Sequence, residues 1–341
     1  MKIKNIFLAI IALLVSNTFI SCSDDDDNPS PTTEPNVYVV GYENNGTHNV
    51  AKVWKNGTPT NLTDGSNSAK AVSVFVNGND VYASGYEYNG TKKIAKLWKN
   101  GIDTNLTDGS NKSTANSVYV NGNDVYVVGY EKNGTHNVAK VWKNGIATNL
   151  TDGTNSAYPN SVFVNGNDVY VAGEESNGTN YVAKVWKNGT PTNLTDGSTN
   201  AYARSVYING SDVYVVGEES NGANYVAKVW KNGIPTSLTD GTNRPYIYST
   251  YVNGNDVYVV GYEHNGTNNV AKIWKNGIAT NLTDGSNDAG ALSVYANGSD
   301  VYVAGYEFNG SEHIARLWKN GIPTSLTDGS NTALAYSVFV K

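Results

Sequence analysis

From residue 37 onward, the chain consists of short runs of apolar residues that end at Asn-Gly or Asp-Gly turn signals. Starting at residue 73, four such runs follow one another and read SVFVNG, DVYASGYE, KIAKLWKNG and IDTNLTDG. Val, Ile and Tyr favour strands, and Asn-Gly between two apolar runs is a strong hairpin signal. No segment shows the periodicity of a helix. The sequence therefore predicts an all-β chain of antiparallel strands, which we call A, B, C and D in chain order.

This four-strand unit repeats at a fixed interval. The sequence contains seven Trp, and each lies in a copy of Ala-Lys-Val-Trp-Lys-Asn-Gly or a close variant, near the end of a predicted strand C. Neighbouring Trp are 44 residues apart throughout, at Trp54, Trp98, Trp142, Trp186, Trp230, Trp274 and Trp318. A period of about 40–45 residues is the length of one four-stranded propeller blade.

The strand order at the two ends predicts how the repeats close. The repeat region begins with a strand B at 37–43 and ends with a strand A at 337–341. Six blades are therefore continuous in sequence, and the seventh combines the C-terminal strand A with the N-terminal strands B, C and D. Closure of this kind leaves no exposed terminal repeat. Residues 37–341 thus resemble a seven-bladed β-propeller of four-stranded antiparallel blades, without the signature residues of the WD40 or kelch families.

Two blades differ from the others at the B–C hairpin. Five copies carry a Tyr in strand B where two carry Glu174 and Glu218, and only those two carry Tyr181 and Tyr225 in strand C. A two-residue Asn-Gly turn at 177–178 would place residue 174 opposite residue 181. We therefore expect Tyr181 to be the direct cross-strand partner of Glu174, because such pairs interact as units.

The first residues have the pattern of an export signal. Lys2 and Lys4 precede a largely apolar run at 6–20, which has signal-peptide length and is short for a membrane span. The run ends in FISC, whose Cys22 is the only cysteine, and SDDDDNPSPTTEP follows. This segment resembles the signal of bacterial lipoproteins, which is cut before a Cys that receives lipid. The acidic tract is similar to the export tag of surface lipoproteins in some Gram-negative bacteria.

The resemblance implies a signal peptide at 1–21, an acidic and Pro-rich linker at 22–36 that begins with a lipid-bearing Cys22, and the propeller at 37–341. It also implies that the protein contacts the outer membrane through its lipid alone, at the cell surface, with the periplasmic face or secretion as alternatives. The alternative is a cleaved signal peptide followed by a solvated linker, but a lone Cys at this position favours the lipoprotein interpretation. The propeller itself contains no Cys and needs no disulfide.

Net charge narrows the range of partners. The formal net charge is -6 and only 16% of the residues are charged, so the sequence gives no indication of nucleic-acid binding. We expect a monomeric ring whose partner is a glycan or a protein.

Most repeated residues have a structural interpretation. The Trp lies among alternating apolar residues, so we expect it to pack between blades, with an exposed sugar platform as the alternative. The Asp of each LTDG motif is expected to form an Asx turn. A Glu also recurs before each B–C turn, and we expect these residues to be solvated strand ends: Glu43, Glu87, Glu131, Glu175, Glu219, Glu263 and Glu307.

The sequence contains no pattern typical of catalysis or metal binding. Seven equivalent carboxylates do not provide two groups of different pKa in one asymmetric cleft. The four His occupy three different repeat positions without zinc-ligand spacing, and no D-x-D-x-D series for calcium occurs. Neither GxSxG nor a phosphate-binding loop is present. We therefore expect no enzyme activity, no cofactor and no metal.

The copies differ on one face of the predicted ring. The A–B and C–D turns hardly vary, whereas the B–C turns and the D–A connections do, and these two emerge on the same face of an up-and-down blade. Two D–A positions, two residues apart and thus on one side of an extended chain, carry most of the variation. The first is Lys70, Thr114, Tyr158, Tyr202, Tyr246, Gly290 or Leu334. The second is Val72, Asn116, Asn160, Arg204, Tyr248, Leu292 or Tyr336.

Three successive blades carry Tyr at the first of these positions, just before inner strand A and near the mouth of the central channel. We predict a ligand site there, with Glu174 and Glu218 from the same blades nearby. Tyr together with Asn and Arg suits a polar ligand with apolar faces, such as a glycan, or a protein hot spot. Drift in tolerant loops is the alternative. The predicted site residues are Tyr158, Asn160, Tyr202, Arg204, Arg244, Tyr246 and Tyr248.

Three functions remain open at this point. The first is a lipid-anchored binding module at the cell surface or in the periplasm, which the tether and the single diversified face favour. The second is a scaffold that docks on an outer-membrane complex. The third is a propeller-type polysaccharide-active enzyme, for which blade-specific polar residues are few. A propeller fold by itself does not choose among them.

Overall fold

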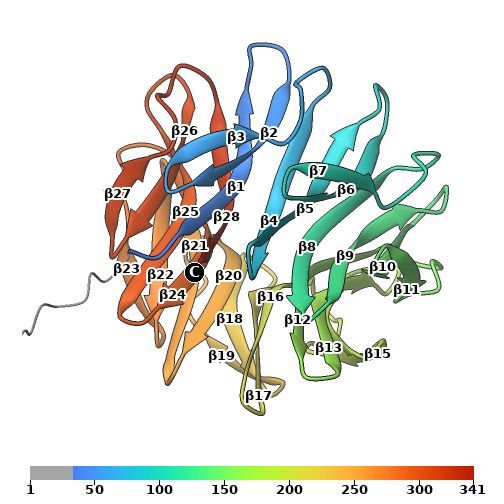
Figure 1. The fold of residues 1–341 in the computed structure, drawn as a ribbon. Helices are drawn as coiled ribbons and strands as arrows, with labels where there is room; N and C mark the ends of the chain where they lie inside the picture. The colour runs from blue at the N-terminus through green and yellow to red at the C-terminus, as the bar shows by residue number, and fades with distance from the viewer. Residues whose placement is uncertain (1–33) are drawn as a thin grey trace, which may run out of the picture. The chain divides into compact units, whose positions relative to one another are not determined.

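Residues 34–341 of the computed structural model are described, and they contain seven four-stranded antiparallel sheets. Figure 1 shows these sheets as blades around a common axis. The predicted signal peptide, Cys22 and the linker up to residue 33 lie outside the described residues. Along residues 34–341, no helix has the length and apolar character needed to cross a membrane.

The strands follow the predicted order A, B, C and D in every blade. Strands A are β4 (Ala69–Asn77), β8 (Ser113–Asn121), β12 (Ala157–Asn165), β16 (Ala201–Asn209), β20 (Pro245–Asn253), β24 (Ala289–Asn297) and β28 (Ala333–Val340). Strands B are β1 (Val37–Asn44), β5 (Asp80–Tyr88), β9 (Asp124–Lys132), β13 (Asp168–Ser176), β17 (Asp212–Ser220), β21 (Asp256–His264) and β25 (Asp300–Phe308). Strands C are β2 (Asn49–Lys55), β6 (Lys93–Lys99), β10 (Asn137–Lys143), β14 (Tyr181–Lys187), β18 (Tyr225–Lys231), β22 (Asn269–Lys275) and β26 (His313–Lys319). Strands D are β3 (Thr58–Asn61), β7 (Ile102–Asn105), β11 (Ile146–Asn149), β15 (Thr190–Asn193), β19 (Ile234–Ser237), β23 (Ile278–Asn281) and β27 (Ile322–Ser325).

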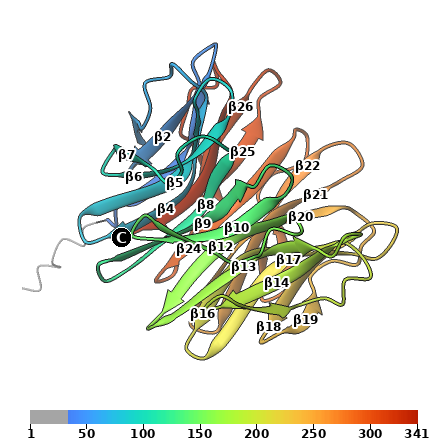
Figure 2. The same ribbon diagram turned by 90° about the vertical axis from the view of Figure 1, so that its right-hand side faces the viewer.

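The predicted closure is confirmed. The C-terminal β28 pairs with β1, so blade 1 has the order β28-β1-β2-β3, and blades 2 to 7 are continuous from β4–β7 to β24–β27. Each strand A lies beside strand A of the next blade, and β28 lies beside β4, which closes the inner ring (Figures 1 and 2). The two ends of the propeller are also joined, because Asn36 and Lys341 exchange two backbone hydrogen bonds.

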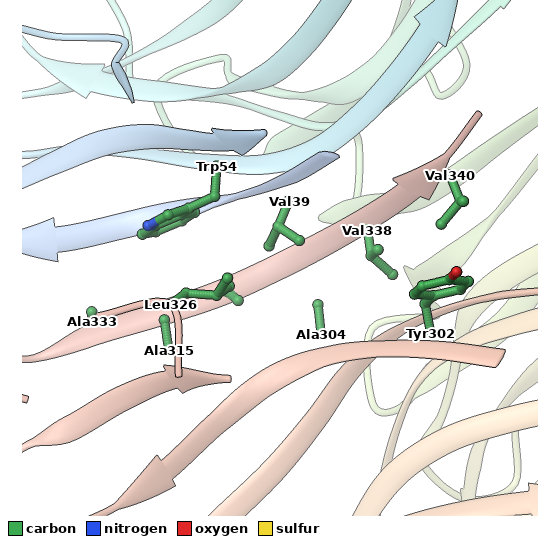
Figure 3. Close-up of a cluster of buried hydrophobic side chains, with 10 residues drawn as sticks. Val39, Trp54, Tyr302, Ala304, Ala315, Leu326, Ala333, Val338 and Val340 are labelled. Atoms are coloured by element: carbon green, nitrogen blue, oxygen red, sulfur yellow. The ribbon is translucent and has the colours of Figure 1, made fainter. Parts of the chain in front are cut away.

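The seven Trp hold neighbouring blades together, as predicted. Each is at most 1% exposed. In Figure 3, Trp54 of blade 1 lies with Val39 against Ala315 and Leu326 of blade 7. A buried Trp removes roughly 150–250 Å² of surface from water, so the repeated WKNG segment is packing followed by a turn. Its Asn and Gly both have positive φ, for example 52° at Asn188 and 83° at Gly189, which is the geometry that a tight hairpin needs.

The inner strands also interact around the whole ring. In each strand A, one backbone amide donates to a Ser hydroxyl on strand A of the preceding blade. Val206 N, for example, donates to Ser161 Oγ at 3.2 Å. Seven aromatic rings on these strands contact one another in a closed circle, with centroids 4.6–5.0 Å apart. We call this circle the aromatic collar: Phe75, Tyr119, Phe163, Tyr207, Tyr251, Tyr295 and Phe339.

The B–C register differs from the prediction. Tyr181 pairs with Ser176, and Glu174 pairs with Ala183, so the expected Glu174–Tyr181 pair is wrong. The loop contains four residues rather than two, because Asn177 Oδ1 accepts the amides of Thr179 and Asn180 and builds an Asx turn. The direct partner of Glu174 on its other side is Tyr158 of strand A.

Candidate functional site

Both variable positions lie within strand A and not in the loop before it, which corrects the predicted D–A connection. In blade 5, Tyr202 pairs with Glu218, and the register then shifts between Ala203 and Ser205, so Arg204 is the extra residue of a β-bulge. The other blades have the same irregularity at the same place. A bulge re-aims the side chain of its extra residue. The second variable position is therefore the bulge residue of every blade.

The bulge explains the Gly that every strand B carries at this level. A Cβ on Gly217 would lie 1.9 Å from the carbonyl oxygen of Tyr202, and one on Gly305 would lie 2.0 Å from that of Gly290. No side chain fits at such a distance, so only Gly allows the two strands to approach here. The repeated Gly thus marks the site of greatest side-chain variation.

In blades 4 and 5 the bulge residues contact two buried carboxylates. Arg204 donates from Nε and Nη2 to Glu218 Oε1 at 3.0 and 2.9 Å. Its Nη1 lies 3.7 Å from Glu174 Oε1. Asn160 Nδ2 donates to Glu174 Oε2 at 2.8 Å and to the carbonyl of Ala203 at 2.9 Å. The structure therefore brings Asn160 and Arg204 together around two carboxylates; we call Glu174, Arg204 and Glu218 the buried ion cluster.

One guanidinium serves two carboxylates in this cluster. The side chains of Glu174 and Glu218 are only 6% and 5% exposed, whereas that of Arg204 is 29% exposed. Burial raises the pKa of Glu174 to about 8, against the opposing effect of Arg204. Burial also raises the pKa of Glu218, and Arg204 again opposes it. At neutral pH, Glu174 therefore holds a proton in most molecules, and Arg204 forms its ion pair with Glu218.

Glu218 has one oxygen left over. Its Oε2 is buried and has no hydrogen-bond partner within residues 34–341. A buried carboxylate oxygen without a donor is costly, and each such atom calls for an explanation. The Arg204 side chain beside it is partly exposed, so a ligand group reaching the guanidinium would come close to Glu218 as well.

Tyrosine rings extend from this cluster across blades 3 to 6. The ring of Tyr158 lies 5.3 Å from that of Tyr130 and 5.8 Å from that of Tyr181, which lies 5.8 Å from that of Tyr202. The ring of Tyr202 lies 5.9 Å from Tyr225. These centroid distances lie within the range of interacting aromatic pairs, so the rings form one continuous surface.

Arg244 continues this row of rings. Its guanidinium carbon lies 4.7 Å from the Tyr225 centroid and 4.8 Å from the Tyr246 centroid, in the geometry of cation–π contacts. Tyr246 in turn stacks on Tyr262 at 4.8 Å, and the ring of Tyr248 lies 5.8 Å from Tyr262. We call the complete row the tyrosine arc: Tyr130, Tyr158, Tyr181, Tyr202, Tyr225, Tyr246, Tyr262 and Tyr248.

A hollow of about 390 Å³ lies at the blade 6 end of the arc. Arg244, Tyr246 and His264 line it together with three Asn side chains and other polar groups. Tyr248 is 37% exposed nearby, which makes it one of the few large apolar side chains that the described part of the chain leaves open to solvent. All seven predicted site residues therefore belong to the arc or to the buried ion cluster and its immediate contacts.

The predicted site had Glu174 and Glu218 nearby but did not include four rings of the arc: Tyr130, Tyr181, Tyr225 and Tyr262. The signal for Tyr181 and Tyr225 was present, since these two replace Asn, Lys or His of the other copies at the start of strand C. Tyr181 was paired with Glu174 and not with Ser176, because the predicted B–C loop was two residues too short.

The seven repeated Glu are not solvated strand ends, which corrects the prediction. Each forms an ion pair with a Lys or Arg of the adjacent strand C, at no more than 3.1 Å, as Glu131 does with Lys140. The two residues are diagonal neighbours on the B–C ladder, because Lys140 pairs with Gly129, two residues before Glu131, so the ion pair follows from the register. The LTDG Asp behave as predicted: Asp196 Oδ1 accepts the amide of Ser198 at 2.9 Å in an Asx turn. Within residues 34–341, no group of His, Cys, Asp and Glu side chains has an arrangement suited to a metal ion.

Comparison with known proteins addresses the fold. Neither a protein-family model nor a curated protein matches the sequence. The β-propeller domain of the Trilobed protease from Pyrococcus furiosus matches with a TM-score of 0.56 and 11% identity, over 87% of this chain and 94% of that domain. This chain is a seven-bladed β-propeller. The Pyrococcus furiosus domain has an open velcro topology, whereas β28 pairs with β1 here.

A second solved structure agrees. The acylaminoacyl peptidase of Pyrococcus horikoshii matches the propeller with a TM-score of 0.54 and 13% identity, over 86% of this chain and 50% of the peptidase. The chain thus spans half the length of that enzyme. At these identities the likeness shows the propeller fold alone.

Proposed function

We propose that this propeller is a binding module that captures a glycan, or a protein surface of similar character, on the face where the B–C and D–A connections emerge. The tyrosine arc is the observation that carries the proposal. All of its rings except the buried Tyr130 are partly exposed, two guanidinium groups lie against them, and a polar hollow adjoins its end. Pyranose rings bind to aromatic faces through their apolar side and to polar groups through their hydroxyls, which is the combination present here.

The Arg and Glu groups add hydrogen-bonding capacity to the arc. Arg204 also lies with its guanidinium carbon 4.6 Å from the Tyr202 centroid. The Arg204 side chain is 29% exposed, so its guanidinium can donate to a ligand hydroxyl. A site built to pair such groups discriminates strongly against ligands that leave them unpaired.

Attachment to the outer membrane belongs to the same proposal. The lipoprotein-type signal with Cys22 would hold a rigid binding ring at the cell surface, or on the periplasmic side, as a monomer. Docking on an outer-membrane complex remains the second role that such a tethered face would serve.

The test combines a glycan array with calorimetric titration of the glycan that binds. Replacing Tyr246 by Ala in the arc should weaken binding at least tenfold, because stacking area is lost at the hollow. Leu334→Ala is the matched control, since Leu334 occupies the same position of blade 1, away from the arc. Equal affinity in the wild type and Tyr246→Ala, with unchanged melting temperature, would remove the proposal.

One observation favours a second candidate, hydrolysis of a polysaccharide. A carboxyl whose pKa lies near 8 beside a carboxylate held by Arg204 is an arrangement that general acid catalysis uses. Release of reducing sugar that disappears in Glu174→Gln would establish this activity. Binding without any turnover would leave the protein a binding module.

A further inference from the structure

A second cluster of blade-specific side chains lies on blades 2 and 3, next to the blade 3 end of the arc. Lys70, Lys93 and Lys112 occupy positions where no other copy carries Lys. Lys70 stands where blades 4 to 6 carry the first-position Tyr of the arc. Lys112 stands where blade 6 carries Arg244. The same repeat positions that build the tyrosine arc therefore build a cationic cluster here.

The Lys side chains lie against aromatic rings. Lys70 Nζ is 4.3 Å from the Tyr42 centroid and 3.3 Å from Tyr336 Oη. Lys93 Nζ is 3.9 Å from the Tyr86 centroid. Such contacts hold an ammonium group in place but leave its charge uncompensated.

None of these three Lys has an acidic partner within residues 34–341. Elsewhere on this face each strand C Lys or Arg is paired with its Glu, as Lys96 is with Glu87 at 3.0 Å. Burial lowers the pKa of Lys70, and the charge of Lys93 lowers it further. Burial lowers the pKa of Lys93 as well, and Lys112 adds to this effect. The cluster is thus a set of like charges that repel one another and lack a counter-ion.

The cluster adjoins a cavity of about 460 Å³ between blades 1 and 2. Its lining combines one Lys of the cluster, two aromatic rings and several polar side chains, among them His48, Asn67, Ser68, Lys70, Tyr86 and Tyr88. It is the counterpart, four blades away, of the hollow beside Arg244 and Tyr246. Its volume is in the range of small-molecule sites.

We propose that this cavity binds the anionic group of an acidic saccharide, a carboxylate or a sulfate ester, with Lys70 as its ion-pair partner. Lys93 and Lys112 add positive potential that attracts the anion. Tyr86 and Tyr88 offer aromatic faces to the sugar ring, and Asn67 and Ser68 offer hydrogen bonds to its hydroxyls. The cavity lies between blades 1 and 2, away from the hollow at the blade 6 end of the tyrosine arc, and the proposal does not depend on the function proposed for the arc.

The experiment titrates the protein with three matched probes: D-glucuronate, D-glucose 6-sulfate and D-glucose, at low and moderate salt. At least one anionic probe should bind, at least tenfold more tightly than glucose, and added salt should weaken it. The better of the two anions identifies carboxylate or sulfate as the preferred group. No binding of either anion overturns the proposal, as does a tetraglutamate peptide that binds more tightly than both.

Variants locate the site. Lys70→Gln should weaken binding of the anion about tenfold or more, because a charge-assisted contact is lost. Lys112→Gln, an exposed side chain whose loss leaves packing intact, should weaken it two- to fivefold through the potential alone. Lys143→Gln is the control of equal charge change, since Lys143 pairs with Asp124 at the opposite end of the strands.

Anion binding at this cavity and ligand binding at the tyrosine arc can be tested independently. Tyr246→Ala should leave glucuronate or sulfate binding unchanged, and Lys70→Gln should leave binding at the arc unchanged. Anion affinity that is the same in Lys70→Gln, Lys112→Gln and the wild type would overturn the assignment to this cavity. Thermal unfolding of each variant confirms the fold, and removal of one repelling charge should not lower the melting temperature.

Discussion

Acidic and basic side chains meet in two very different settings in this protein. The seven repeated Glu–Lys or Glu–Arg pairs lie at the strand ends, with Glu side chains 14–27% exposed. The buried ion cluster occurs once, with Glu174 and Glu218 only 6% and 5% exposed. The repeated pairs have equal numbers of opposite charges, whereas the cluster has two carboxyl groups for one guanidinium.

Neither the repeated pairs nor the buried ion cluster is explained by a large contribution to stability. Partly exposed ion pairs add little to stability because solvent screens them. A buried cluster costs desolvation energy that its own attraction hardly offsets, so it is not explained by a gain in stability. Proteins keep such costly arrangements mainly at functional sites.

The largest predicted effect comes from removing one cation from each setting and comparing the losses of stability. Arg204→Met leaves the buried carboxylate of Glu218 without its cation and should destabilise the protein by about 3–5 kcal/mol at pH 7. Arg316→Met removes the partner of Glu307 at a partly exposed pair and should cost about 1 kcal/mol or less. Denaturant unfolding measures both. Equal losses of stability would mean that burial does not set the ion cluster apart from the repeated pairs.

The second prediction uses pH. Because burial raises the pKa of Glu174 from 4.5 to about 8, the folded state binds this proton more tightly than the unfolded state. The stability that the proton contributes is present below pH 4.5 and is lost as pH rises through 8. Glu174→Gln mimics the protonated group, so it should gain stability relative to the wild type over this range. Each tenfold difference in proton affinity corresponds to about 1.4 kcal/mol, so the gain should reach a few kcal/mol.

Glu175→Gln is the control for this pH series, because Glu175 is the repeated residue of the same blade and pairs with Lys184 at 2.7 Å. Its stability relative to the wild type should hardly change between pH 5 and pH 8. A flat difference curve for Glu174→Gln would contradict the protonated state assigned to Glu174.

The smallest predicted effect tests whether the bulge positions the cluster. Gly217→Ala and Gly305→Ala place a Cβ equally close to a carbonyl oxygen, but the bulge residue is Arg204 in blade 5 and Leu292 in blade 7. The blade 5 variant should lose on the order of 1 kcal/mol more, because the displaced bulge also weakens the Arg204–Glu218 pair.

The Arg204→Met background checks this coupling. There the ion pair no longer exists, so the excess cost of Gly217→Ala over Gly305→Ala should disappear. An excess that persists in this background would mean that packing in blade 5, and not the ion pair, causes the difference.

Much of the architecture was predictable from the repeat. Seven Trp at a constant interval, Asn-Gly turns and the strand order at the ends predict a closed seven-bladed ring, and the pairing of β28 with β1 confirms it. The face and the blades of the candidate site were also predicted, because identical scaffold residues make the variable ones stand out. The prediction failed at the B–C loop, where an Asn side chain, and not the backbone alone, sets the loop length. It also failed at the repeated Glu, since ion pairing across strands requires the correct register.

The repeat, the strands and the residues that form the turns can be predicted from the sequence alone, because they depend on residues close together in the chain. That Asn160 and Arg204 meet Glu174 and Glu218 depends on the tertiary structure. A bulge in each of two blades turns Asn160 and Arg204 toward these two carboxyl groups. Burial then decided their charge, because the pKa of a carboxyl depends on the surroundings that packing creates. The aromatic collar has the same origin: its seven rings are 44 residues apart in sequence and become neighbours only when the ring closes.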